Sequence, residues 1–428
     1  MQVQTASATT VRPATVSPRA ARLRTLRAPH ALAFWVVAVA FLANMAFSAV
    51  PTPLYVLYQQ RDHFSDFTVT VVYAVYAVGV IASLFLGGHV SDWMGRKRLL
   101  VSALLVNVAS ALVFVFAPSL PGLIVARVVS GVSVGLTTAA ATAYLAELHR
   151  HARPGAHGRR AEIVATAANL GGIGVGPLVA GLLAQFAPAP LRLPYVCFGL
   201  ALVVLALLIT LAPETVVRPD EPPRWRPQRM AVPPSARGKF FAATAAGIAA
   251  FAVYGVFNSL VPSFLAGTLH ELSHAVAGAV AFSAFAAGAL AQIACSRMAI
   301  PRMLRFSVPV LVVGLGLFAA GMWLPSLAVF VVGGVVTGAG AGLVFRGALV
   351  SAASTAPAES RAEVLAGFFL GAYVGLSIPV VGLGVATTYV AANQAMLWFV
   401  VAAAVATALS VWAVTRPGPG GGTDPEGQ

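Results

Sequence analysis

Charged residues are the scarcest class in this sequence. They make up 9% of its 428 residues, whereas 59% of the residues are hydrophobic. A soluble globular domain uses about a quarter of its residues as charged ones to cover its surface. The composition therefore excludes a water-soluble globule and predicts a chain embedded in a lipid bilayer.

Cysteine is nearly absent, and motifs for reactive groups are missing. Cys197 and Cys295 fall inside apolar runs far apart in the chain, which favours packing roles over a disulfide or a metal site. The sequence has no Gly-x-x-x-x-Gly-Lys-Ser/Thr loop for nucleotide phosphates, and no paired His or Asp/His set within its apolar runs. We therefore expect no metal, no cofactor, no ATP hydrolysis and no enzymatic activity.

Long apolar runs are abundant. A helix needs about 20 apolar residues to cross the hydrocarbon core, and unbroken runs such as 196–211 exclude the alternating pattern of membrane β-strands. Twelve helical spans are predicted, near residues 32–55, 67–90, 99–117, 121–143, 161–186, 192–212, 239–265, 274–296, 303–323, 326–348, 363–388 and 394–415.

The net charge of +14 comes from an uneven placement of basic residues. Of the 27 Lys and Arg residues, 24 fall in joints and tails on one side of the predicted spans, two (Arg61 and Arg192) on the other, and Arg127 lies inside a span. Cytoplasmic loops carry such an excess, so both termini are predicted to be cytoplasmic. The basic excess therefore reflects topology, and we expect no nucleic-acid partner.

The chain divides into two similar parts. A proline-rich linker at 213–238 separates a six-helix half at 32–212 from a second one at 239–415, and glycines and a proline of the fifth span recur in the eleventh. Residues 1–31 and 416–428 are predicted to be a disordered cytoplasmic tail and a flexible C-terminal tail. The predicted fold class is all-α integral membrane, with twelve helices in two pseudo-symmetric halves.

The joint between the second and third spans carries the most specific motif. It reads Gly-x-x-x-Asp-x-x-Gly-Arg-Lys-Arg and resembles the signature of the major facilitator superfamily in this loop. The resemblance implies a secondary transporter in which this loop holds one conformation closed. The gating residues implied are Gly88, Asp92, Gly95, Arg96, Lys97 and Arg98.

The fourth span contains Arg127-Val-Val-Ser-Gly131, which resembles the Arg-x-x-x-Gly pattern of the same family. An arginine in the bilayer is costly unless it faces a polar interior. The resemblance assigns Arg127 to proton coupling or to the charge of the substrate. A structural hydrogen bond to a neighbouring helix is the alternative.

The fifth span is similar to a motif of the twelve-helix drug/proton antiporters in the family, with Ala180 where a glycine is usual. Its residues are Gly172, Gly176, Pro177 and Gly181. The resemblance implies an exporter, because uptake members generally lack this motif. A packing seam with no influence on direction is the alternative.

Acidic residues are missing from the middle of every predicted span, although many proton-coupled exporters place a carboxylate there. This pattern favours a neutral or anionic amphiphile as substrate, and leaves Asp92 or Asp66 to carry a coupling proton. Polar side chains inside the spans are candidates for the substrate cavity, with interhelical hydrogen bonding as the alternative. They are Asn44, Tyr73, Tyr76, Asn169, Tyr254, Asn258, Gln292 and Tyr373.

We therefore expect a monomeric secondary transporter that exports a drug-like or toxic small molecule by alternating access. Two alternatives stay open, an uptake permease for a nutrient such as an organic acid and a membrane sensor that transports nothing. The strong preference for Arg over Lys, with abundant Ala, Val and Gly, indicates a bacterial plasma membrane.

Overall fold

The computed structural model describes residues 29–87, 94–216, 232–357 and 360–416, and the described part of the chain is helical without strands. Twelve helices in it are long and apolar enough to cross a membrane. The prediction of an all-α membrane protein with twelve spans is therefore confirmed.

The first half contains six spans, some built from consecutive helices. Their elements are α2 (His30–Ala49), η1 (Thr52–Leu54) and α3 (Tyr55–Asp62); α4 (Asp66–Gly87); α6 (Arg96–Phe116); α7 (Leu120–Ala152); α8 (Arg159–Thr166), the π-helical turn η2 (Ala167–Gly171) and α9 (Gly172–Phe186); and α10 (Leu193–Thr210).

The second half also contains six spans. Its elements are η3 (Pro234–Ala236), α11 (Arg237–Ser259) and α12 (Val261–Gly267); α13 (His274–Ala294) and η4 (Cys295–Arg297); α14 (Ile300–Trp323); α15 (Leu327–Ala353); α16 (Arg361–Ala386); and α17 (Ala392–Thr415).

Most helix ends lie within a few residues of the predicted ones, but α7 is longer. It ends at Ala152 rather than at residue 143, because no proline or glycine follows residue 143 before Pro154 and Gly155. Its last turns carry His149, Arg150 and His151 and are polar enough to continue as a helix beyond the hydrocarbon core. Hydropathy finds where a span leaves the membrane, not where its helix stops.

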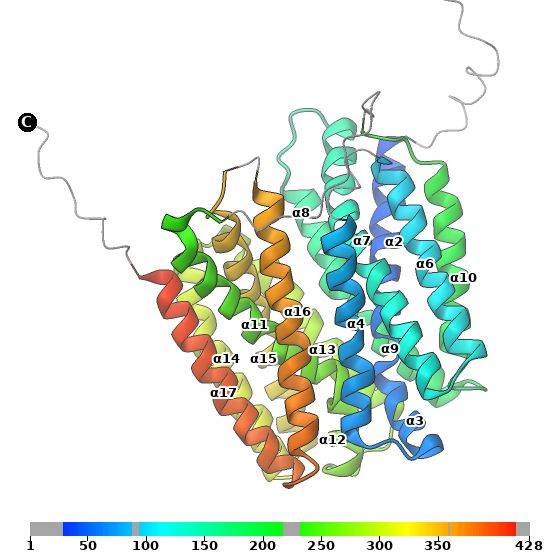
Figure 1. Ribbon diagram of the computed structural model, residues 1–428, viewed down its shortest axis with the longest axis vertical. Coiled ribbons are helices and arrows are strands. Elements are labelled where there is room, and N and C mark those ends of the chain that lie inside the picture. Colours follow the sequence, from blue (N-terminus) through cyan, green and yellow to red (C-terminus); the bar gives the residue numbers. More distant parts are fainter. Residues whose placement is uncertain (1–28, 88–93, 217–231, 358–359, 417–428) are drawn as a thin grey trace, which may run out of the picture.

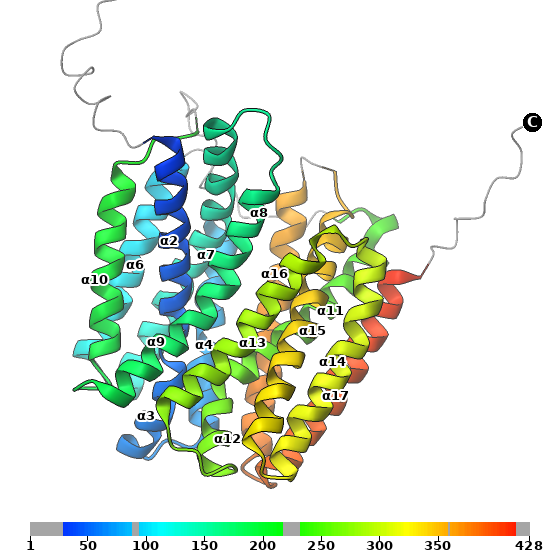
Figure 2. The ribbon, with the colours of Figure 1, turned by 180° about the vertical axis from the view of Figure 1, so that it is seen from behind.

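The two halves stand side by side, with α2 to α10 in one bundle and α11 to α17 in the other (Figure 1). They meet where α9 packs on α13 and α4 packs on α16. The reverse view shows α9 crossing toward α13 (Figure 2). We call the end of the bundle that carries α8 the α8 end, and the opposite end, with α3 and α12, the α12 end.

The outward faces of the helices are apolar. Leu200 and Leu207 on α10, and Val401 and Leu409 on α17, each expose more than half of their surface. In water such faces would be costly, whereas in hydrocarbon they are matched by lipid tails. The low charge of the sequence is thus explained by a surface that faces lipid along most of each span.

Candidate functional site

A cavity of about 620 Å³ lies between the two halves. Helices α2, α4, α7, α8 and α9 line it from the first half, and α11, α13, α15 and α16 line it from the second. Its walls are mostly aliphatic and aromatic, with a few polar groups, as in sites for small organic molecules. At the α8 end the lining includes the exposed residues Thr142, Ala146, Glu162 and Val350, so the cavity opens there.

The α12 end is sealed by neutral hydrogen bonds between the halves. The Thr52 hydroxyl donates to the Asn258 backbone oxygen at 3.0 Å and lies 3.3 Å from its side-chain Oδ1. The Ser263 hydroxyl donates to the Gln59 Oε1 at 3.1 Å. These bonds join the first span to the seventh and close the cavity on this side.

Arg127 lies on α7 with 2% of its surface exposed, and its guanidinium lines the cavity. Its Nη1 donates to the Ser48 carbonyl at 2.6 Å, and its Cζ lies 4.6 Å from the ring centre of Tyr76 and 5.4 Å from that of Tyr73. Its Nε is buried without a partner among the described residues. Arg127 therefore makes the interhelical bond that was the structural alternative, and still presents a positive charge and a free donor.

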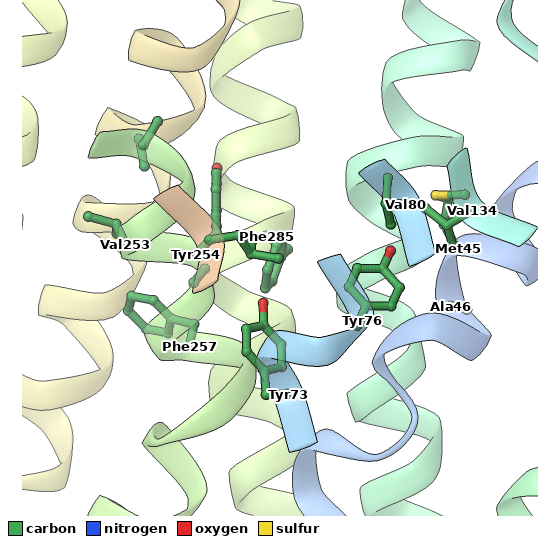
Figure 3. Close-up of a cluster of buried hydrophobic side chains, with 14 of the residues drawn as sticks. Met45, Ala46, Tyr73, Tyr76, Val80, Val134, Val253, Tyr254, Phe257 and Phe285 are labelled. Carbon is green, nitrogen blue, oxygen red and sulfur yellow. The ribbon is translucent and has the colours of Figure 1, made fainter. Parts of the chain in front are cut away.

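Of the predicted cavity residues, Tyr73, Tyr76, Asn258 and Tyr373 line the cavity. Figure 3 shows Tyr73 and Tyr76 projecting from α4 opposite Tyr254 of α11. The Tyr76 and Tyr373 rings meet edge-to-face across the two halves, with centres 6.3 Å apart. Asn169, Tyr254 and Gln292 also line the cavity.

Asn44 does not line the cavity. It is fully buried inside the first half, where its Nδ2 donates to Ser133 at 3.1 Å and to Thr137 at 2.8 Å, and its Oδ1 accepts from Asn107 at 2.9 Å. These bonds join α2 to α6 and α7. They use both the amide nitrogen and the amide oxygen of Asn44, so neither group remains for a ligand. The expectation of a cavity role for Asn44 is replaced by the alternative, an interhelical hydrogen bond.

Several residues that line the cavity were not predicted from the sequence. Arg346, counted there with the cytoplasmic joints, lies on α15 and lines the cavity near the α8 end. Its Nη2 donates to Glu162 of α8 at 2.6 Å, so this ion pair crosses from one half to the other. The position of Arg346 inside the predicted span 326–348 was the signal that could have found it. Aromatic rings of the walls, such as Phe251 and Phe345, carried no comparable signal.

The predicted gating loop is anchored to its own half in the described residues. The Glu214 carboxylate accepts from the backbone N–H groups of Arg96 (3.0 Å) and Lys97 (3.3 Å), which caps the start of α6. Glu147 of α7 accepts from the Arg96 Nε at 3.3 Å. Gly95 has φ +99°, and a Cβ there would lie 2.5 Å from Glu214 Oε2, so this position requires glycine.

Arg98 is exposed, and Gly88 and Asp92 lie outside the described residues. Glu147 and Glu214, the acidic partners of the loop, were missed because they are distant in sequence.

The motif of the fifth span forms two close contacts. A Cβ on Gly172 or Gly176 would meet the carbonyl of Leu42 or Ala46 on α2, at 2.6 and 2.0 Å. On the opposite face, Gly181 contacts α13 in the other half, where a Cβ would lie 2.3 Å from the His274 carbonyl. The motif is therefore a seam that lets α9 touch helices of both halves.

The same fold and family are found by comparison. The family model described as Major Facilitator Superfamily matches residues 36–308. A crystal structure of a mutant of the nucleoside transporter NupG matches with a TM-score of 0.68 at 13% identity, over 90% of this chain and 100% of that one. A bacterial homologue of the human lysosomal transporter Spinster, in an inward-facing and unoccupied conformation, matches with a TM-score of 0.67 at 14% identity, over 91% and 99%. No curated protein matches the sequence.

Two six-helix halves enclose a cavity that is closed at one end. This arrangement defines the class of membrane transporters whose solute site lies between two halves. The chain belongs to the major facilitator superfamily.

Proposed function

We propose that this protein exports a drug-like or toxic small molecule, neutral or anionic, from the cytoplasm of a bacterium. The observation that carries the proposal is the cavity of about 620 Å³ with Arg127 in its wall and mostly apolar and aromatic surroundings. A cationic solute would meet a like charge in a low-dielectric space, whereas an anion is attracted there. A solute of this kind binds by its apolar body, with few polar contacts to orient it.

Orientation follows from the basic residues. Arg159 and Arg160 start α8 and Arg150 and Arg153 end the α7 region, so the α8 end is the basic one and is proposed to face the cytoplasm. The structure is then inward-facing, ready to accept a cytoplasmic solute. Alternating access requires the α12 end to open when the α8 end closes, with α9 and α13 sliding along the glycine seam.

The remaining assignments extend this proposal. Both termini lie in the cytoplasm, residues 213–238 link the halves, and the functional unit is a monomer. Export against a gradient needs a driving ion, and the similarity of the fifth span to drug/proton antiporters favours the proton. The loop that contains Arg96 and Lys97 serves as the gate by fixing the cytoplasmic ends of its half.

The test is a growth assay in a bacterium that lacks its own efflux pumps. We expect expression of the chain to raise the inhibitory concentrations of neutral or anionic aromatic antimicrobials but not those of cationic ones. A protonophore should abolish the protection. Sensitisation instead would indicate uptake, and no change for any compound would contradict the proposal.

Variants separate a role of Arg127 in the cavity from a general effect of charge. Arg127→Ala should remove the protection, because the cavity loses its buried cation. Arg150→Ala is the matched control, since Arg150 is exposed near the end of the same helix. A fluorescent fusion reports whether each variant reaches the membrane. Protection that survives Arg127→Ala would rule out its assignment to substrate charge or coupling.

A further inference from the structure

The charges that line the cavity are unbalanced. Two arginines line it, Arg127 from the first half and Arg346 from the second, and Glu162 is the single acidic residue among its described lining residues. Two positive groups and one negative group leave one positive charge over. This surplus of positive charge favours a ligand that carries a negative charge.

Arg346 is built to hold an anion. Only 14% of its side chain is exposed, and its Nη1 reaches the Gln292 carbonyl at the long distance of 3.4 Å. Its Nε is buried and has no partner among the described residues. A carboxylate normally binds a guanidinium through two parallel N–H bonds, and the Nε–H of Arg346 is available for one of them.

The present partner of Arg346 can be exchanged. Glu162 belongs to the opposite half, and 55% of its side chain is exposed. A partly exposed ion pair is worth about 0–1 kcal/mol, because water and salt compete for both groups. An incoming carboxylate that replaces Glu162 keeps the charge on Arg346 balanced and returns Glu162 to water at the mouth.

The walls beside Arg346 suit a flat apolar body. The ring of Phe345 lies 5.1 Å from that of Phe251 and 6.3 Å from that of Phe369, between ring centres, and all three residues line the cavity. Tyr373 continues this aromatic wall toward Tyr76 and Arg127. Aromatic rings pack well against other rings at such distances.

We propose that Arg346 is the anion-binding group at the mouth of the cavity, and that it takes the carboxylate of an aromatic organic anion in exchange for Glu162. The ligand's ring then lies against the phenylalanines, with Arg127 deeper in the same cavity. This assignment rests on the proposed function, of which it narrows the substrate class. It also makes the ion pair between the halves a contact that substrate opens.

Calorimetric titration of the full-length protein in lipid nanodiscs tests the proposal with a matched pair of probes, 2-naphthoate and its neutral counterpart 2-naphthamide. The wild-type protein should bind the carboxylate more tightly than the amide. Arg346→Gln should weaken carboxylate binding by about tenfold or more, since a charge-assisted bond is lost, and change amide binding little. Glu162→Gln should strengthen carboxylate binding, because the competing anion is gone.

A matched control and a charge exchange separate ligand binding from gating. Arg159→Gln removes another arginine that bridges the halves at the same end, through Ser296, but lies outside the cavity lining. It should leave the affinities unchanged. The double variant Glu162→Arg with Arg346→Glu restores an ion pair, so a gate alone would keep normal carboxylate binding, whereas the proposal expects the binding to stay weak.

Equal affinity of the wild-type protein for the two probes, affinity for neither, or normal carboxylate binding by Arg346→Gln or by the charge exchange would overturn the proposal. Each of these results leaves the growth assay free to show export of neutral compounds. Failure of the growth assay for every compound, with the expected binding pattern intact, would instead reject the export function alone.

Discussion

The two ends of the cavity are held together by different chemistry. At the α12 end the halves share neutral hydrogen bonds between buried or half-buried groups, such as Thr52 with Asn258. At the α8 end they share a charged contact, Glu162 with Arg346, in which the glutamate is largely exposed. Neutral bonds in a dry interface have no water to replace them, whereas an exposed ion pair exchanges readily.

The difference shows how the cavity can be closed at the α12 end while its α8 end can respond to a charged solute. The α12 end depends on close packing, because glycines let the helix backbones touch. A few neutral hydrogen bonds then fix the position of one half against the other. The open end depends on charge, which an ionic solute can rearrange without disturbing the packing. Substitutions that alter fit should therefore have larger effects than those that alter single bonds.

The largest effect is expected from Gly278→Leu on α13. A Cβ there would lie 2.2 Å from the Pro177 carbonyl of α9, and backbone cannot move aside cheaply. We expect the seam between the halves to be forced apart, with transport in the growth assay lost and the unfolding temperature in detergent lowered.

Gly316→Leu on α14 is the control for this prediction. No atom lies within 4 Å of a Cβ built at Gly316, so the larger side chain should be tolerated. Normal transport by Gly278→Leu would show that the close contact of α9 and α13 is not required.

A smaller effect is expected from Thr52→Val, which removes the bond to Asn258 but keeps the shape of the side chain. The loss of about 1 kcal/mol should shift the balance toward opening of the α12 end by about fivefold. The measurement is the labelling rate of a Ser48→Cys variant, in a Cys197→Ser/Cys295→Ser background, by an impermeant maleimide added on the α12 side.

Thr68→Val serves as the comparison. Thr68 lies at the same end, but its hydroxyl bonds locally to Ser65 and not to the other half. Labelling should stay at the background rate in this variant, and an unchanged rate in Thr52→Val would mean that the neutral bond does not seal the cavity.

The smallest effect is expected from Glu214→Gln, at the α8 end but within one half. The substitution removes the charge that caps the start of α6, at a cost of roughly 0.3–1 kcal/mol. Thermal unfolding should shift slightly, while binding of 2-naphthoate should not change. Glu363→Gln, in the first turn of α16 in the other half, is the control and should have a still smaller effect, because no described group bonds to its side chain. A changed affinity in Glu214→Gln would connect the loop network to the cavity.

The division into halves could be predicted from the proline-rich linker and the recurring glycines. The twelve helical spans could be predicted from long apolar runs that lack the alternating pattern of strands, because only helices and closed barrels satisfy the backbone inside lipid. The same logic identified Arg127, Tyr73 and Tyr373, since polar groups within such runs need a reason to be there.

Which polar group faces the cavity could not be read in the same way. Asn44 and Asn258 both lie in the first span of their half, yet Asn44 bonds to Ser133 and Thr137 inside its own half while Asn258 lines the cavity. That choice depends on the neighbours that packing supplies. The bonds of Glu214 and Glu147 to Arg96 join residues 118 and 51 positions apart, a separation at which local patterns carry no information.

The π-helical turn at Ala167–Gly171 sets how far α8 is rotated relative to α9 around the axis of the fifth span. Such a turn holds one residue more than an α-helical path, and one residue corresponds to a rotation of about 100° around the axis. Below it, α9 directs Gly181 at α13, and above it, α8 directs Glu162 at Arg346. If all five residues of the turn followed an α-helical path instead, α8 would be rotated by about 100° relative to α9, and Glu162 would face away from Arg346 with both side chains of the pair unaltered. The position of the Glu162 charge at the mouth therefore depends on the backbone path of the helix as well as on the identity of its residues.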